Sequence, residues 1–123
     1  MKKKIFFWLN ANIIDFCVSY YLQKITDAEF YAIIDVTNKP KKFFKEQKLV
    51  LFKKIWFYHD HIKTHKSVDL DNLENIALVH IDCDLYSSTK YVLDTLKKNI
   101  DNNCIIVFDE IVNYINFLKE NPS

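Results

Sequence analysis

Glycine and arginine are both absent from this chain of 123 residues. Average usage of about 7% would give roughly eight or nine glycines. Glycine lets the backbone approach phosphate groups closely, so its absence excludes the usual glycine-rich loop that holds a phosphate or a dinucleotide. Lysine supplies all 17 positive charges, against 16 acidic residues. Nucleic-acid-binding proteins are usually more basic and use arginine for bidentate contacts, so we expect no nucleic-acid partner.

Long hydrophobic runs and paired cysteines are also scarce. The apolar run at residues 5–9 is too short for a signal peptide and no small-residue cleavage site follows it, while no other segment is long enough to span a bilayer. Cys17, Cys83 and Cys104 are widely spaced and form no CxxC pair, which is typical of small buried side chains in a reducing compartment. We therefore expect a cytoplasmic protein with no membrane partner.

Hydrophobic residues make up 50% of the chain, enough to predict one folded domain over residues 1–123. Apolar runs alternate with helical patterns along the sequence. Strands are expected at residues 4–9, 30–36, 55–58, 77–81 and 104–108, and helices at 12–24, 41–52, 87–98 and 111–118. Continuous apolar strands are typical of a parallel sheet that is covered on two faces. The sequence thus predicts a three-layer, Rossmann-like α/β fold with a mostly parallel five-stranded sheet and helices on both faces.

Other positions carry expectations about burial. The first helix is expected to bury Ile13, Ile14, Cys17, Val18, Tyr21 and Leu22. The aromatic residues expected in the core, with a sugar-stacking platform as the alternative, are Phe6, Phe7, Trp8, Phe43, Phe44, Phe52, Trp56, Phe57 and Tyr58. Residues 59–75 are interpreted as a loop over a site, with a short helix near 69–74 and with His59, His61 and His65 in solvent. His80, inside a strand, is expected to be buried and hydrogen-bonded.

Two acidic clusters follow expected strands. Asp82 and Asp84 come after residues 77–81, and Asp109 and Glu110 come after residues 104–108. If these strands are neighbours in a parallel sheet, their ends lie roughly 5 Å apart. Carboxylates that converge there repel one another, and a divalent cation relieves the repulsion. The simpler alternative is that these acids cap helices or are favoured by the positive end of the helix dipole in a first helical turn.

The residues around both clusters resemble a known family. Residues 79–89, then Leu93 and residues 105–110, resemble the macrocin O-methyltransferases, which are S-adenosylmethionine-dependent, metal-assisted sugar O-methyltransferases. The family pattern is D-x-D-x-Y-x-S-T after a strand, then a helix and a second strand that ends in an acidic pair, and here it covers about residues 77–114. The resemblance implies Asp82, Asp109 and Glu110 as ligands of Mg²⁺ or another divalent cation, and Asp82 and Asp84 as catalytic residues.

The cofactor and the acceptor follow from the same resemblance. It implies S-adenosylmethionine as cofactor and a hydroxylated small molecule, such as a sugar, as acceptor. Asp35, at the end of the second expected strand, is the candidate that accepts a hydrogen bond from the cofactor's ribose. The chain departs from the family where Glu110 replaces an aspartate, and where residues 9–12 and 101–103 lack glycine.

Two other functions stay open. A glycosyltransferase-like domain also uses a D-x-D after an apolar strand to hold a divalent ion against a sugar nucleotide. A non-catalytic α/β module fits the short length and the missing glycine-rich loop. An oligomer or a longer parent chain is a further open question about partners.

Overall fold

The computed structural model describes residues 2–10, 13–63, 70, 73–81, 86–101 and 103–108. Strands and helices alternate throughout this part of the chain. The elements are β1 (Lys4–Leu9), α1 (Ile13–Ile25), β2 (Glu29–Ile34), α2 (Asn38–Glu46), β3 (Phe52–Phe57), α3 (Tyr58–Lys63), β4 (Ile76–Ile81), α4 (Tyr86–Leu96) and β5 (Ile105–Phe108). The expected helix at 111–118 lies outside the described residues.

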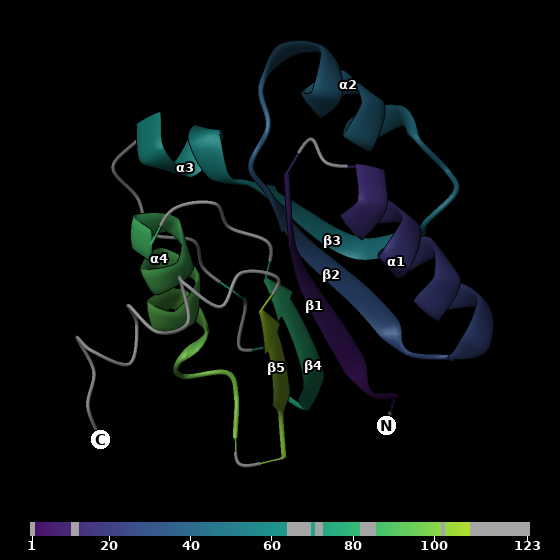
Figure 1. Cartoon of the computed structure of the whole chain (residues 1–123), viewed down its shortest axis with the longest axis vertical. Coiled ribbons are helices and arrows are strands. Elements are labelled where there is room, and N and C mark those ends of the chain that lie inside the picture. Colours follow the sequence, from purple (N-terminus) through teal and green to yellow (C-terminus); the bar gives the residue numbers. More distant parts are fainter. Residues whose placement is uncertain are drawn as a thin grey trace.

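The five strands form one sheet in the order β3-β2-β1-β4-β5, and every neighbouring pair is parallel. Helices α1 and α2 lie on one side of the sheet and α4 lies on the other (Figure 1). The predicted Rossmann-like α/β fold is therefore confirmed. The chain leaves β1 in one direction along the sheet and returns to add β4 on the opposite side of β1. Such a reversal of strand order is where this kind of sheet binds its ligands.

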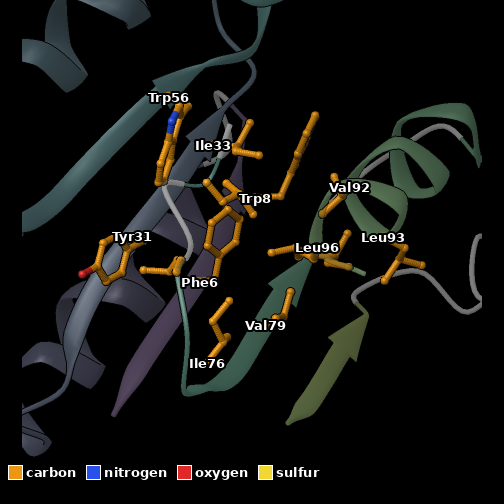
Figure 2. Packing of buried hydrophobic residues seen from close by; sticks show 13 residues of the cluster. Phe6, Trp8, Tyr31, Ile33, Trp56, Ile76, Val79, Val92, Leu93 and Leu96 are labelled. Carbon is orange, nitrogen blue, oxygen red and sulfur yellow. The ribbon is translucent and has the colours of Figure 1, made fainter. Parts of the chain in front are cut away.

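One side of the sheet, here called the α4 face, is packed with aliphatic and aromatic side chains. Figure 2 shows these side chains filling the space between the strands and α4. Its buried members are Phe6, Trp8, Tyr31, Ile33, Trp56, Leu70, Leu73, Ile76, Val79, Ile81, Val92, Leu93 and Leu96. Because successive strand residues point to opposite sides, the same strands also supply the other face.

The opposite side, here called the α1 face, is covered by α1 and α2. Its buried apolar members are Ile5, Phe7, Leu9, Phe16, Phe30, Ala32, Ile34, Val36, Phe44 and Val50. The expectation of an aromatic core is confirmed for Phe6, Phe7, Trp8, Phe44 and Trp56, whereas Phe43 is 43% exposed. Burial on both sides explains why β1 and β2 read as unbroken apolar runs rather than alternating ones.

An irregularity in β4 adjusts which residues reach each face. Lys4 pairs with Ile76 and Ile5 pairs with Leu78, so Ala77 is an extra residue between them. An extra residue of this kind shifts the inward and outward alternation by one position. Ile76 and Val79, three residues apart in sequence, consequently both pack on the α4 face.

The expected orientation of α1 is wrong. The residues that face the sheet are Asp15, Phe16 and Ser19, and all three are buried. Four of the residues expected inside are instead exposed: Ile13, Ile14, Cys17 and Tyr21. The Phe16 ring packs edge-on against the ring of Phe44, with centroids 5.7 Å apart. This aromatic contact between α1 and α2 fixes the rotation of α1.

The second helix also differs from the expected range of 41–52, since α2 begins at Asn38 and ends at Glu46. The side chain of Gln47 explains the end. Its Oε1 accepts hydrogen bonds from the backbone N–H groups of Leu49 and Val50, and its Nε2 donates to the Val50 carbonyl. These bonds give the backbone a turn in place of a further helical turn, so that residues after 51 enter β3.

The stretch after β3 differs from the expected loop. Residues 58–63 form α3 directly after β3, which places His59 and His61 on a helix. The described residues 73–75 are not helical, while 69, 71 and 72 lie outside the described part. Among the described helices, none has the length and apolar character needed to cross a membrane.

Candidate functional site

The carboxyl ends of β1 and β4 meet at the reversal of strand order. Trp8 of β1 pairs with Ile81, the last residue of β4. Open α/β sheets bind ligands just outside the strand ends at such a reversal, because the connections on either side diverge there and leave a crevice. This edge of the sheet is therefore the candidate location of a site. Asp82 follows Ile81 directly in the sequence.

The next strand brings the second acidic segment to the same edge. β5 pairs with β4 in parallel, and its last residue, Phe108, lies opposite Ile81. Neighbouring strands lie about 4.8 Å apart. The residues that precede Asp82 and Asp109 are thus direct neighbours, as the sequence prediction required.

The predicted metal ligands and catalytic residues themselves, Asp82, Asp84, Asp109 and Glu110, lie outside the described residues. Their roles therefore stay predictions. Within the described ranges, no group of three or more His, Cys, Asp or Glu side chains is arranged to hold a metal ion.

Asp35, the predicted ribose ligand, lies at the same edge directly after β2. Its backbone N–H donates to the carbonyl of Leu9 at 2.7 Å, which extends the pairing of β2 with β1. Its carboxylate Oδ1 lies 2.7 Å from Nε2 of His59 on α3, and the two side chains are 28% and 39% exposed. The carboxylate is thus positioned at the end of β2 and remains in contact with solvent.

Polar contacts hold helix α3 at this edge. Besides the His59–Asp35 contact, the Lys41 ammonium on α2 lies 2.7 and 2.9 Å from the two carboxylate oxygens of Asp60. The expected loop is wrong for His59, which lies on a helix and contacts Asp35, while its side chain stays 39% exposed. The contact joins residues from different elements, so no local pattern in the sequence indicates it.

A second acid–histidine contact lies deeper, on the α1 face. Asp15, in the first turn of α1, is 2% exposed, and His80, near the end of β4, is 8% exposed. Their Oδ1 and Nε2 atoms are 4.0 Å apart, too far for a hydrogen bond and close enough for electrostatic interaction. The Phe7 ring lies beside the imidazole, with centroids 5.8 Å apart. The expected burial of His80 is confirmed.

Sequence reasoning missed the part that Asp15 takes in this contact. The signal was present, since Asp15 is an acidic residue inside an apolar helical pattern. The apolar spacing of α1 does not by itself show that this acidic side chain is buried, because apolar residues lie on both sides of the helix. The contact between Asp15 and His80 lies close to the carboxyl end of β4, because only Ile81 separates His80 from Asp82 in the sequence.

Aromatic side chains close the α4 face near the same edge. Tyr58 lies edge-on to both Trp8 and Tyr91, with ring centroids 5.0 Å apart in each case. The Tyr91 hydroxyl is buried and has no hydrogen-bond partner in the part of the chain that the structure describes. Trp8 is 1% exposed, so its ring belongs to the core rather than to a sugar-stacking surface.

A hollow of about 330 Å³ lies at the opposite, amino-terminal edge of the sheet. It is lined by Lys2, Lys3, Asn75, Ile76, Ala77, Asp101 and Asn103. Nearby, burial and secondarily the negative charge of Asp101 raise the pKa of the Cys104 thiol. Cys104 therefore stays protonated at neutral pH and is a poor nucleophile.

No protein-family model, curated protein or solved structure matches this chain.

Proposed function

We propose that this chain is an S-adenosylmethionine-dependent, divalent-metal-assisted O-methyltransferase domain that acts on a sugar or another hydroxylated small molecule. One observation carries the proposal. β4 and β5 are parallel neighbours that pair through their last residues, Ile81 and Phe108. The two acidic segments of the family-like pattern follow those residues directly.

The strand order supports a cofactor site at the same edge. S-adenosylmethionine would occupy the crevice outside the ends of β1 and β4, where Rossmann-like sheets take their ligands. Asp35 follows β2, the neighbour of β1 on the other side, and is a candidate acceptor for the ribose hydroxyls. A carboxylate has about four acceptor sites on its two oxygens, so the contact with His59 leaves capacity for a ribose.

The residues assigned to the metal fit a hard cation. Asp82, Asp109 and Glu110 offer carboxylate oxygens, the ligands that Mg²⁺ prefers. A divalent cation bound there would lower the pKa of a sugar hydroxyl that coordinates it. Asp82 would orient the hydroxyl through the cation, and Asp84 would accept the hydroxyl proton as the sugar oxygen bonds to the methyl carbon. The carbon–sulfur bond of the cofactor would break in the same step, and its electron pair would stay on sulfur in a neutral thioether.

The proposal includes the cellular location of the chain. We propose a cytoplasmic enzyme, since the thiols of Cys17 and Cys104 are both free. A glycosyltransferase-like activity and a non-catalytic role are the other outcomes that the experiment has to distinguish.

Calorimetric titration of the full chain tests the proposal. We expect S-adenosylmethionine to bind, and Asp35→Asn to weaken that binding at least about tenfold by removing a charged acceptor. Mn²⁺ serves as the probe for the metal site. Asp82→Asn should weaken Mn²⁺ binding at least about tenfold. The matched control is Asp94→Asn, which changes an exposed aspartate of α4 that pairs with Lys90 and should leave both affinities unchanged.

The alternatives give different results. Binding of a uridine diphosphate sugar with Mn²⁺, without binding of S-adenosylmethionine, would favour glycosyl transfer. No binding of either ligand would favour the non-catalytic module. Equal Mn²⁺ affinity in the wild type and in Asp82→Asn would remove Asp82 from the metal site and with it the argument from the paired strand ends.

A further inference from the structure

Helix α1 has a mostly apolar outer side. Two of its polar side chains, Asp15 and Ser19, instead face the sheet, at 2% and 0% exposure. The exposed residues of α1 are Ile13, Ile14, Cys17, Tyr20, Tyr21, Lys24 and Ile25. The outer side of a surface helix normally carries charged and polar residues, with the apolar ones facing the core. The outer side of α1 is therefore built to be covered.

The apolar surface continues onto the segment before β3. The side-chain amide of Gln23 donates to the carbonyl of Leu49 at 2.8 Å, and its oxygen accepts from the backbone N–H of Leu51 at 2.7 Å. These bonds hold the segment against the carboxyl-terminal half of α1. Leu49 and Leu51 are 57% and 73% exposed. We call this surface the α1 patch: Ile13, Ile14, Cys17, Tyr20, Tyr21, Ile25, Leu49 and Leu51.

The size of the α1 patch matches an interface. Side chains of this kind, more than half exposed in most cases, offer roughly 100 Å² each. The patch as a whole therefore exposes on the order of 800 Å², which is above the usual limit for a monomer surface. It also equals the share of about 800 Å² that one partner contributes to a standard stable interface.

The charge distribution favours a second copy of the same chain as the partner. The only charged side chain among the exposed residues of α1 is Lys24, and its Nζ lies 5.0 Å from the centroid of the Tyr20 ring. The centre of the patch is thus uncharged and can pack against itself without repulsion. If the two-fold axis lies perpendicular to α1, the two copies of α1 run antiparallel, which places opposite ends of their dipoles together.

We propose that the chain forms a symmetric dimer through the α1 patch, with α1 antiparallel to α1 of the second copy. Helix α1 has 13 residues and is about 20 Å long, so a full overlap buries the patch along its whole length. Helical spacing puts Cys17 near the middle of the outer side, where two such thiols come near each other across the axis. Figure 1 shows α1 on the outside of the sheet, on the side opposite α4.

Sedimentation velocity over a concentration series tests the proposal. We expect the wild type to be a dimer and Ile14→Glu to be a monomer, with a dimer dissociation constant at least about a hundredfold higher because each change occurs twice in a symmetric interface. The matched control is Ile105→Glu on β5, since Ile14 and Ile105 are 65% and 63% exposed. The control should leave the dissociation constant unchanged. Thermal melts followed by circular dichroism establish that both variants fold.

Cross-linking with a short bismaleimide tests the placement of α1 separately. In a Cys83→Ser, Cys104→Ser background, Cys17 should give a covalent dimer, and adding Ile14→Glu should abolish it. A wild type that stays monomeric over the concentration series overturns the proposal. A monomer whose α1 patch binds lipid vesicles overturns it as well. A dimer that survives Ile14→Glu also overturns it. None of these outcomes depends on methyltransferase activity, so the two proposals succeed or fail independently.

Discussion

The two faces of the sheet differ in what they bury, although the same strands supply both. In the part of the chain that the structure describes, the buried residues of the α4 face are aliphatic or aromatic (Figure 2). The α1 face buries Asp15, Ser19 and His80 among its apolar residues. Buried polar groups cost free energy unless they are satisfied. Among the described residues, the α4 face therefore depends on apolar packing, whereas the α1 face also holds buried polar side chains that need polar partners.

The covering helices show the same difference. Helix α4 places Val92, Leu93 and Leu96 on the sheet, at the spacing of one helical face. Helix α1 places Ser19 at a comparable depth. The Ser19 hydroxyl donates to the carbonyl of Phe16 at 2.6 Å, so it is satisfied within its own helix. Ser19 therefore contributes little to the stability of the sheet packing, whereas Leu96 contributes the burial of a whole apolar side chain.

The largest effect should come from breaking the apolar face. Leu96 and Ser19 are both 0% exposed. We expect Leu96→Ala to lower the free energy of unfolding by about 3 kcal/mol, because it removes buried methyl groups and leaves a cavity. The matched change Ser19→Ala should alter it by less than about 1 kcal/mol, since the lost hydroxyl bonded only within α1 and alanine favours the helix. Urea denaturation measures both values.

Equal losses from these two substitutions would contradict the comparison. In that case the Ser19 hydroxyl would be as important to packing as a leucine side chain. A loss below about 1 kcal/mol for Leu96→Ala would mean that the surrounding side chains collapse into the cavity.

The same contrast explains what the sequence could predict. In α4 the buried residues Val92, Leu93 and Leu96 recur at the spacing of one helical face, so the periodicity of the sequence indicates the buried side. In α1 apolar residues lie on both sides, and periodicity cannot choose between them. The choice depends on the contact of Phe16 with α2, which no local pattern contains. The fold class followed from continuous apolar strands, which a two-sided sheet requires.

The candidate site could be predicted only where strand ends determine it. The pairing of Ile81 with Phe108 follows from the expected neighbouring strands, and the structure confirms it. The His59–Asp35 contact joins residues 24 positions apart in sequence, so it depends on how α3 packs after β3. The Asp15–His80 contact joins α1 to β4. Contacts of this kind are set by tertiary packing and leave no signature at fixed spacing.

A smaller effect should come from the polar residues of the α1 face. We expect Asp15→Asn and His80→Gln each to lower the free energy of unfolding by about 2 kcal/mol, because each changes a buried polar group whose surroundings are fixed. The double variant should lose less than the sum, with an interaction of at least about 0.5 kcal/mol, since the two side chains lie 4.0 Å apart. A double-mutant cycle by urea denaturation measures the interaction. Strictly additive losses would show that the two groups contribute separately to the α1 face.

The smallest effect is a pH dependence on the α4 face. Burial, and secondarily the negative charge of Glu29, raise the pKa of Tyr31 above its ordinary value of about 10. The folded chain then keeps a proton that the unfolded chain releases. This contribution to stability is complete below about pH 10 and is lost as the pH rises through the folded-state pKa. We expect the free energy of unfolding to fall less steeply above pH 10 in Tyr31→Phe than in the wild type.

Urea denaturation at a series of pH values measures that slope. At pH 7 the wild type and Tyr31→Phe should differ by less than about 1 kcal/mol, since only a hydroxyl is removed. Glu29→Gln should reduce the alkaline slope without abolishing it, because burial is the larger cause of the raised pKa and remains. If the free energy of unfolding instead depends on pH in the same way in the wild type and in Tyr31→Phe, the Tyr31 hydroxyl is hydrated in the folded chain. Water would then be excluded from the α4 face at β1 and β4, which α4 covers, and not at Tyr31 of β2.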